Sequence, residues 1–374
     1  MAGLYIHIPF CKSKCSYCDF YSGVQGSLTD KLVDALQHEI RLRADYLKGD
    51  ELQTIYFGGG TPSILTHRQL SNIFTTIATI WDIGKCTEIT LEANPDDLSA
   101  EKLKELSELP INRLSIGIQS FHDEELSMLR RKHSAQQAVE AVREAQPYFQ
   151  NISIDLMYGL PGQTISGWEH TILQALALNI QHISAYHLTY ETGTLLDRKR
   201  KEGRIVPVTE EISVAMYYLL QNRLKDQDIK QYEISNFAIP GFHSRHNSSY
   251  WEGIKYLGIG PSAHSFDGES RQWNIANTLQ YITSIEQKKN YFEKELLSTT
   301  DKYNEKIMIS LRTIQGISVE RIEAEFGTQT KQKLIQQSER FIKAGIMFLD
   351  NNHLHLTPEG LFLSDGIITD LMQE

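Results

Sequence analysis

Three cysteines near the N-terminus are the residues whose types and spacing point most directly to chemistry. Cys11, Cys15 and Cys18 stand as Cys-x3-Cys-x2-Cys, so three thiols lie within eight residues. Iron–sulfur clusters are held by cysteine thiolates, and a [4Fe–4S] cluster normally takes four of them. Three thiolates would leave one iron open to a ligand that is not protein. The spacing therefore predicts an open [4Fe–4S] cluster.

Two other uses of these cysteines have to be weighed. Zinc would need a fourth ligand, for which His7 is within reach, but structural zinc sites usually join two separated cysteine pairs, and no second pair follows. A disulfide framework is also disfavoured, because the chain has only four cysteines and Cys86 stands alone. No secretory signal is recognisable at the N-terminus, so we expect a reducing compartment.

Size and composition limit the remaining function classes. The chain has 374 residues, of which 41% are hydrophobic and 22% charged, as is ordinary for a globular protein of two or three domains. The net charge of −10 argues against a nucleic-acid partner. No apolar run reaches the length of about 18 residues that a transmembrane helix needs. We expect a cytoplasmic protein, which can reach a membrane surface through a partner.

Strand and helix patterns alternate through the first half of the chain. Short β-rich runs cover 4–8, 54–57, 88–92, 113–119, 151–157 and 182–188. A helical period covers 29–47, and N-terminal capping signals stand at Thr66, Ser134 and Ser166. Six strand–helix units with short connections predict an α/β fold with a parallel sheet, curved into an incomplete (β/α)6 TIM-like barrel over residues 1–228.

The pattern changes after the predicted barrel. Residues 229–295 are rich in glycine and aromatic residues, and we interpret them as a linker region. Residues 296–374 predict two helices, a hairpin turning at Asn351-Asn352 and a last helix starting at Thr357-Pro358, which is a winged-helix-like α+β domain. Eight Lys and Arg face eleven Asp and Glu in this segment. Packing or partner binding is therefore favoured over DNA binding.

Polar residues and glycines gather where the predicted strands end. Gly58-Gly59-Gly60-Thr61 follows the second strand, Glu92 and Gln119 end the next two, and Asp155 lies in the fifth. Active sites of parallel α/β barrels lie at this edge of the sheet, and glycines let a backbone approach a ligand closely. Each carboxylate alone is more often a structural hydrogen-bond acceptor. Together with the cysteines they predict a ligand site beside the cluster.

The cysteine motif with its flanks, Tyr5-Ile-His-Ile-Pro-Phe-Cys11 and Tyr17-Cys-Asp-Phe20, resembles radical S-adenosylmethionine (SAM) enzymes. It is most similar to the branch that contains oxygen-independent coproporphyrinogen III oxidase (HemN) and the haem chaperone HemW. The resemblance implies that SAM binds the open iron, and that a reductase or flavodoxin supplies an electron for its cleavage. The residues it implies for SAM are Tyr5, Tyr17, Gly59, Gly60, Thr61, Glu92, Gln119, Arg131 and Asp155, with Arg131 rather than Arg130 on the SAM carboxylate.

A second motif lies in the predicted linker region. His246-Asn-Ser-Ser-Tyr250-Trp251 places His246 and Tyr250 four residues apart, on one face of a helix. By itself the run fits a histidine and two aromatic residues packed in a linker. It also resembles the motif associated with HemW-type chaperones. That resemblance implies haem binding, with His246 on the iron and Tyr250 and Trp251 beside it.

Two departures separate the chain from the oxidases of this branch. The oxidases carry a further cysteine after the motif, where this chain has Asp19-Phe20, and they have an extension ahead of it, whereas Tyr5 stands close to the start. The implied function is a haem chaperone that keeps a SAM-binding cluster and passes haem to membrane haemoproteins. The alternative is a coproporphyrinogen III oxidase. The sequence leaves open whether SAM is cleaved or only bound, and which oligomer forms.

Overall fold

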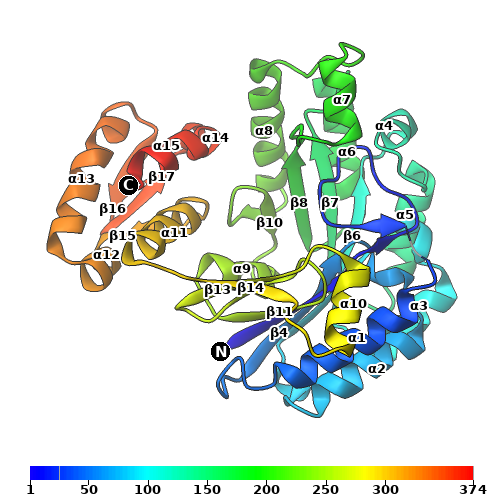
Figure 1. Ribbon diagram of the computed structural model, residues 1–374. Helices are drawn as coiled ribbons and strands as arrows, with labels where there is room; N and C mark the ends of the chain where they lie inside the picture. Colours follow the sequence, from blue (N-terminus) through cyan, green and yellow to red (C-terminus); the bar gives the residue numbers. More distant parts are fainter. Residues whose placement is uncertain (25, 374) are drawn as a thin grey trace.

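The computed structural model describes residues 1–24 and 26–373, and it contains the predicted parallel sheet (Figure 1). Neighbouring strands pair in parallel in the order of the chain. They are β1 (Ala2–Ile8), β4 (Leu52–Gly59), β5 (Glu88–Ala93), β6 (Arg113–Gln119), β7 (Ile152–Tyr158) and β8 (His182–His187). The predicted α/β fold class, a curved and incomplete barrel of six parallel strands, is confirmed.

Helices cover the outside of this sheet (Figure 1). They are α1 (Thr29–Leu42), α2 (His67–Ala78), α3 (Ala100–Ser107), α4 (Asp123–Met128), α5 (Ala135–Ala145), α6 (Ile165–Leu176), α7 (Leu195–Lys201) and α8 (Glu210–Lys225). Thr66 and Ser134 form capping boxes, as predicted. The cap predicted at Ser166 is wrong. Thr164 accepts from the Gly167 N–H instead, so α6 begins earlier and Ser166 lies in its first turn.

The segment 229–295, predicted as a linker region, extends the sheet at both edges. Its strands are β9 (Lys230–Gln231), β10 (Asn236–Ala238), β11 (Tyr256–Ile259), β12 (His264–Phe266), β13 (Ser270–Asn274) and β14 (Phe292–Leu296). β10 pairs with β8, while β11 pairs in parallel with β1, so the sheet has twelve strands among the described residues. Two helices, α9 (Arg245–Trp251) and α10 (Thr278–Glu286), complete the segment. β2 (Phe10–Cys11), which contains the first cysteine, pairs in parallel with β3 (Gly23–Val24), which follows the last.

The C-terminal segment folds around a hydrophobic core of its own and lies to one side of the barrel (Figure 1). Its elements are α11 (Thr299–Leu311), β15 (Ile317–Ser318), α12 (Val319–Phe326), α13 (Thr328–Lys343), β16 (Met347–Asp350), β17 (His353–Leu356), α14 (Pro358–Phe362) and α15 (Ser364–Leu371). The two predicted helices, the hairpin and the helix starting at Pro358 are present in the predicted order, and α11 before them and α15 after them were not predicted as separate helices. Asn351 and Asn352, with φ of 45° and 63°, make the hairpin turn. The domain boundaries after 228 and 295 stay predictions.

No helix in the described ranges, 1–24 and 26–373, has both the length and the apolar character that crossing a membrane requires.

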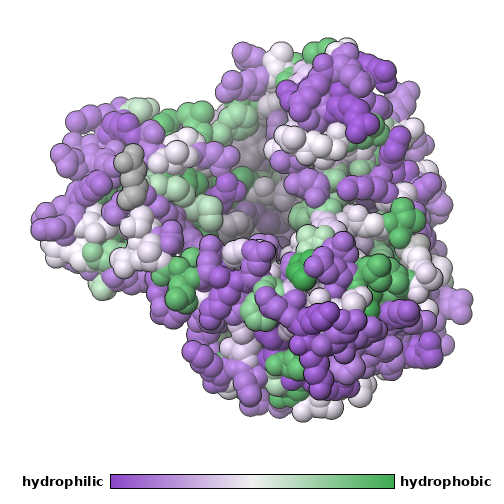
Figure 2. All heavy atoms as spheres, viewed as in Figure 1, coloured by the Kyte–Doolittle hydropathy of each residue, from purple (hydrophilic) through white to green (hydrophobic). Residues whose placement is uncertain are grey.

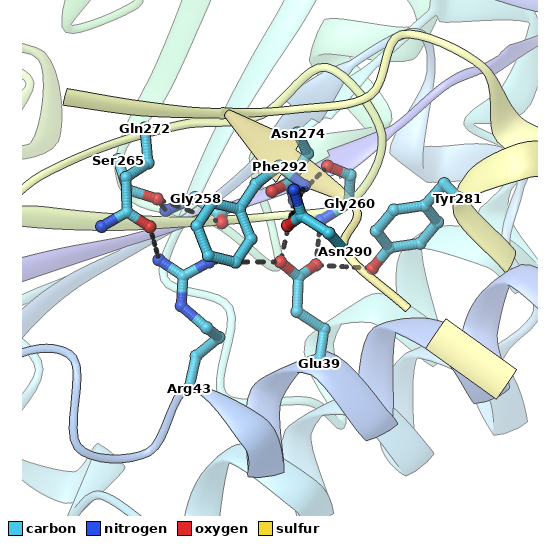
Figure 3. Close-up of polar contacts among 10 residues, drawn as sticks. All are labelled: Glu39, Arg43, Gly258, Gly260, Ser265, Gln272, Asn274, Tyr281, Asn290 and Phe292. Atoms are coloured by element: carbon cyan, nitrogen blue, oxygen red, sulfur yellow. Dashed lines mark hydrogen bonds and ion pairs between the residues drawn. The ribbon is translucent and has the colours of Figure 1, made fainter. Parts of the chain in front are cut away.

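A buried carboxylate ties the added strands to the barrel (Figure 3). Glu39 of α1 is fully buried and accepts hydrogen bonds from the Gly260 N–H at 2.8 Å, from Asn274 Nδ2 at 2.8 Å and from the Tyr281 hydroxyl at 2.5 Å. Arg43 lies 3.8 Å away on the same helix. Because a buried charge is costly unless it is hydrogen-bonded, this network holds β11, β13 and α10 against α1.

We expect Tyr281→Phe to destabilise the protein by about 1.5–3 kcal/mol, since a buried carboxylate would lose one charge-assisted hydrogen bond. Tyr46→Phe is the matched control, because the Tyr46 hydroxyl is buried without a hydrogen-bond partner in the described structure. Urea unfolding of the metal-free protein, followed by far-UV circular dichroism, measures both. Equal unfolding midpoints for the two variants would contradict the role assigned to Glu39.

Candidate functional site

One large cavity opens at the C-terminal ends of the parallel strands. Its volume is about 970 Å³, and its walls come from the cysteine loop, the strand ends, α8 and the C-terminal domain. Figure 2 shows the molecular surface hollowed between the C-terminal lobe and the barrel. This is the edge of a parallel barrel at which active sites are built. The volume is at the upper end of the usual range for small-molecule sites, about 300–1,000 Å³.

The cysteine loop forms one end of this cavity. Cys11, Cys15 and Cys18 are half-buried free thiols that all line it. Ser16 fixes the loop, because its N–H donates to the Leu129 carbonyl at 3.1 Å and its hydroxyl donates to the Met128 carbonyl at 2.9 Å. The loop is therefore held against the end of α4, with its three thiols facing one space.

The donor set fits an iron–sulfur cluster with three protein ligands. Burial raises the pKa of the Cys11 thiol, and it raises the pKa of Cys18 to about 11, so both are protonated at neutral pH until iron displaces the protons. Arg131 Nη1 lies 3.4 Å from Cys15 Sγ and brings a positive charge beside the thiols. In the described part of the chain, no three His, Cys, Asp or Glu side chains converge on a single metal ion.

The glycine run lies directly against the segment that enters the cysteine loop. The Gly60 N–H donates to the Ile8 carbonyl at 2.8 Å, and the Thr61 N–H donates to the Phe10 carbonyl at 2.7 Å. A Cβ on Gly60 would lie 2.5 Å from the Phe10 oxygen, so no side chain fits there. Gly59, with φ of 103°, would place a Cβ 2.5 Å from the His7 ring. The glycines let two backbones meet beside the cavity.

Two half-buried carboxylates on strands of the sheet face the cavity. Glu92 at the end of β5 accepts from the Tyr56 hydroxyl at 2.7 Å and from the Gly59 N–H at 3.2 Å. Burial, with a smaller effect of the nearby Asp155 charge, raises the pKa of Glu92 to about 7. Burial also raises the pKa of Asp155, which lies on β7. A cationic ligand beside these two carboxyl groups would lower their pKa again and favour their charged form.

Arg131 is a half-buried cation of the site. Its Nη2 donates to the Gly117 carbonyl and to Asn94 Oδ1, while its Nε is buried without a hydrogen-bond partner among the described residues. Gln119, which ends β6 at a register shift, is buried with φ of 72°. A left-handed conformation at a residue other than glycine is strained and is found mostly at functional sites.

The structure brings together all but one of the residues predicted for SAM. Tyr17, Gly59, Gly60, Thr61, Glu92, Gln119, Arg131 and Asp155 line the cavity. Tyr5 does not appear in its wall. The Tyr5 side chain points into the barrel below the cavity, where its hydroxyl lies 3.1 Å from His7 Nδ1 and its ring stacks on Tyr56 at 6.1 Å.

The three residues predicted for haem lie outside the cavity, at the opposite end of the barrel. His246 on α9 is fully buried, with Nδ1 2.8 Å from Thr54 Oγ1 and Nε2 2.9 Å from the Tyr250 hydroxyl. Burial lowers the pKa of His246 to about 3, so the ring is neutral. Neither ring nitrogen is free to bind iron in this arrangement.

The helix that carries these residues closes the bottom of the barrel. The Glu88 carboxylate accepts from the N–H groups of Arg245 at 2.6 Å and His246 at 3.1 Å, at the N-terminus of α9. Trp251 is half-buried, and its Nε1 is buried without a partner in the described structure. Iron ligation by His246 stays a prediction, and it would require α9 to move out of the barrel.

Sequence reasoning missed other residues of the cavity. Asn94, whose Nδ2 donates to Thr61 Oγ1 at 3.0 Å, directly follows β5, so the rule of strand ends could have found it. The same rule applies to Tyr186 and His187 at the end of β8. Arg312 and Phe362 reach the cavity from the C-terminal domain, and no local pattern signals their position.

Comparison with known proteins agrees with this geometry. Residues 5–175 match the model of the radical SAM superfamily, and residues 297–363 match the model of the HemN C-terminal domain. The solved structure of coproporphyrinogen III oxidase (HemN) from Escherichia coli superimposes with a TM-score of 0.86 at 23% identity, covering 100% of this chain and 90% of that one. This match shows a shared fold.

Relatives described as heme chaperone HemW align along the whole chain. The Bacillus subtilis protein is 34% identical, and the alignment covers 100% of both chains. The Lactococcus lactis protein is 33% identical over 97% of this chain and 95% of its own. A zebrafish (Danio rerio) protein, radical S-adenosyl methionine domain-containing protein 1, is 30% identical over 100% of this chain and 87% of its own. The chain therefore belongs to the HemW family of the radical SAM superfamily.

Proposed function

We propose that this protein binds haem and hands it to haemoprotein acceptors, while holding a [4Fe–4S] cluster and SAM in its cavity. The proposal rests on the full-length similarity to relatives described as heme chaperones, one of them 34% identical with 100% of both chains covered. Asp19-Phe20, where the oxidases carry another cysteine, supports the same conclusion. Cytoplasmic location and delivery to a membrane haemoprotein are parts of this proposal.

Within the cavity, the cysteines would hold the cluster and the surrounding residues would hold SAM. Cys11, Cys15 and Cys18 supply the three thiolates. We propose that Arg131 pairs with the SAM carboxylate, and that Glu92 and Asp155 bind the amino group and the ribose of SAM. SAM on a reduced cluster supplies radical chemistry, for which a flavodoxin or reductase would deliver the electron. The protein positions the molecule and excludes water.

SAM affinity should fall as the pH drops below about 7. Glu92, with a pKa of about 7 in the empty site, must lose its proton to pair with the SAM ammonium group. Below that pH, binding must also displace the proton, which weakens affinity by up to about tenfold per pH unit. Isothermal titration calorimetry from about pH 6 to about pH 7.5 measures this dependence. Glu92→Gln should bind more weakly and with a flatter profile; a slope as steep as in wild type would exclude Glu92 as its source.

Haem titration tests the proposed function. The cluster-containing protein should bind haem saturably under anaerobic conditions, with a defined Soret band. Absence of saturable binding would refute the proposal. The alternative, a coproporphyrinogen III oxidase, has the HemN-like fold in its favour. Reduced protein given coproporphyrinogen III and SAM should release no carbon dioxide and form no vinyl groups. Turnover would establish the alternative.

A further inference from the structure

The cavity has an outer end that the cluster and SAM residues do not account for. This end lies between the end of β8, the start of α8 and the C-terminal domain, and it continues from the cysteine end without a break. If haem binds this protein, as proposed above, it needs a pocket with a flat apolar wall, an iron ligand and a partner for its propionates. The outer end offers all three.

His187 is the iron ligand that this end provides. Among the described residues that line the cavity, it is the only histidine. It is exposed to the cavity, and its ring lies over Gly159, where a Cβ would approach Nε2 to 2.5 Å. The Tyr158 ring meets it edge-on at 5.1 Å. Desolvation by the surrounding cavity walls lowers the pKa of His187, which favours the neutral imidazole that binds iron.

One hydrogen bond holds the His187 ring and can be given up. Nε2 lies 2.9 Å from the Ser213 hydroxyl, which itself donates to the Thr209 carbonyl at 3.1 Å. Ser213 therefore accepts from Nε2–H. For iron to bind at Nε2, the ring would have to turn away from the Ser213 hydroxyl, which occupies the position that the iron would take, and the neutral ring would carry its proton on Nδ1. Ser213 would keep its bond to Thr209. His246, by contrast, would have to leave the barrel interior with the helix that carries it.

The walls around His187 suit a flat apolar ring with acidic substituents. Tyr186, Tyr217 and Phe362 line this end, with the Tyr217 and Phe362 rings 6.3 Å apart across the join between barrel and C-terminal domain. Arg312 also lines it. Its Nη2 pairs with Asp365 at 2.6 Å, but its Nε is buried without a hydrogen-bond partner in the described structure. A carboxylate is the natural partner of that free donor.

We propose that haem binds at this outer end, between β8 and the C-terminal domain, with His187 on the iron and Arg312 beside a propionate. The aromatic residues of both domains would enclose the ring, so a shift of the C-terminal domain would uncover it for an acceptor. This would be the haem site of the function proposed above, so the inference rests on that function.

Haem titration of four single variants tests this site. The full chain with its cluster in place is used, because free cysteine thiolates also bind haem iron. His187→Gln keeps a side chain that can donate to Ser213 but cannot replace the imidazole, and Arg312→Gln removes the positive charge. His246→Ala tests the competing ligand, and His38→Ala is the control, because His38 is exposed on α1 away from the cavity. Circular dichroism establishes that each variant is folded.

We expect His187→Gln to weaken haem binding by about tenfold or more and to change the Soret band, with added imidazole restoring the spectrum. Arg312→Gln should weaken binding by several-fold, and His38→Ala should match wild type. A wild-type spectrum and affinity in His187→Gln would overturn the proposal. Loss of the iron ligand in folded His246→Ala alone would overturn it in favour of α9. If wild type itself binds no haem, the proposed function fails, and this site with it.

Discussion

Cys15→Ala should leave the protein without its iron–sulfur cluster after reconstitution. The structure holds the three thiols on one loop at the cavity, so removing the middle one leaves two ligands where a cluster of this kind needs at least three. Iron and acid-labile sulfide should fall to background, and the visible charge-transfer absorption should disappear.

Cys86→Ala is the matched control for this result. Cys86 is half-buried, and its thiol donates to the Leu52 carbonyl at 3.4 Å, away from the cavity. We therefore expect wild-type iron and sulfide content in this variant. Retention of a full cluster by Cys15→Ala, or its loss from Cys86→Ala, would show that the ligand set is wrong.

Arg131→Gln should reduce SAM affinity about 30-fold or more. Truncating one partner of a buried, hydrogen-bonded charge pair costs about 2–5 kcal/mol, and about 1.4 kcal/mol corresponds to a factor of ten. Arg131 also orients Asn94 and lies beside Cys15, so its loss disturbs the surrounding site. The measurement is SAM binding to reconstituted protein, normalised to cluster content.

Arg130 offers a control at the adjacent position. It also lines the cavity, but it is exposed. Arg130→Gln should change SAM affinity by no more than a few-fold, because an exposed charge contributes little. If both variants lost affinity equally, a general effect of positive charge would replace the specific contact assigned to Arg131.

The parallel sheet was predictable because its signals are local. Each strand is a short apolar run, and the caps at Thr66 and Ser134 follow from side chains three residues apart. The α6 cap shows where such reasoning stops. Thr164 and Ser166 are both competent caps, and the choice between them depends on where the preceding loop leaves the sheet.

Residues of the site were predictable where the strand-end rule applies. Glu92 and Gln119 reach one cavity because parallel strands end at a common edge. Asp155 and Tyr5 both lie in the middle of their strands, so this rule does not place them; Asp155 lines the cavity, whereas Tyr5 faces the barrel interior.

Contacts between segments far apart in the sequence could not be predicted from local patterns. The position of α9 depends on Thr54 and Glu88, more than 150 residues away along the chain. The sequence around His246 gives no sign of either partner. The motif was therefore predicted to lie in a linker, whereas the structure places it on the helix that closes the barrel. The joining of β11 to β1 and the contact of Phe362 with Tyr217 likewise arise from the packing of distant segments.

Haem transfer tests the proposed function most directly. Protein loaded with one equivalent of haem is mixed with vesicles that carry a membrane haemoprotein in its haem-free form, and the acceptor's absorption spectrum is followed. We predict transfer at a rate that rises with acceptor concentration and exceeds the rate of haem loss to excess apomyoglobin. A transfer rate that equals the rate of loss to apomyoglobin at every acceptor concentration would contradict handover and leave only passive release.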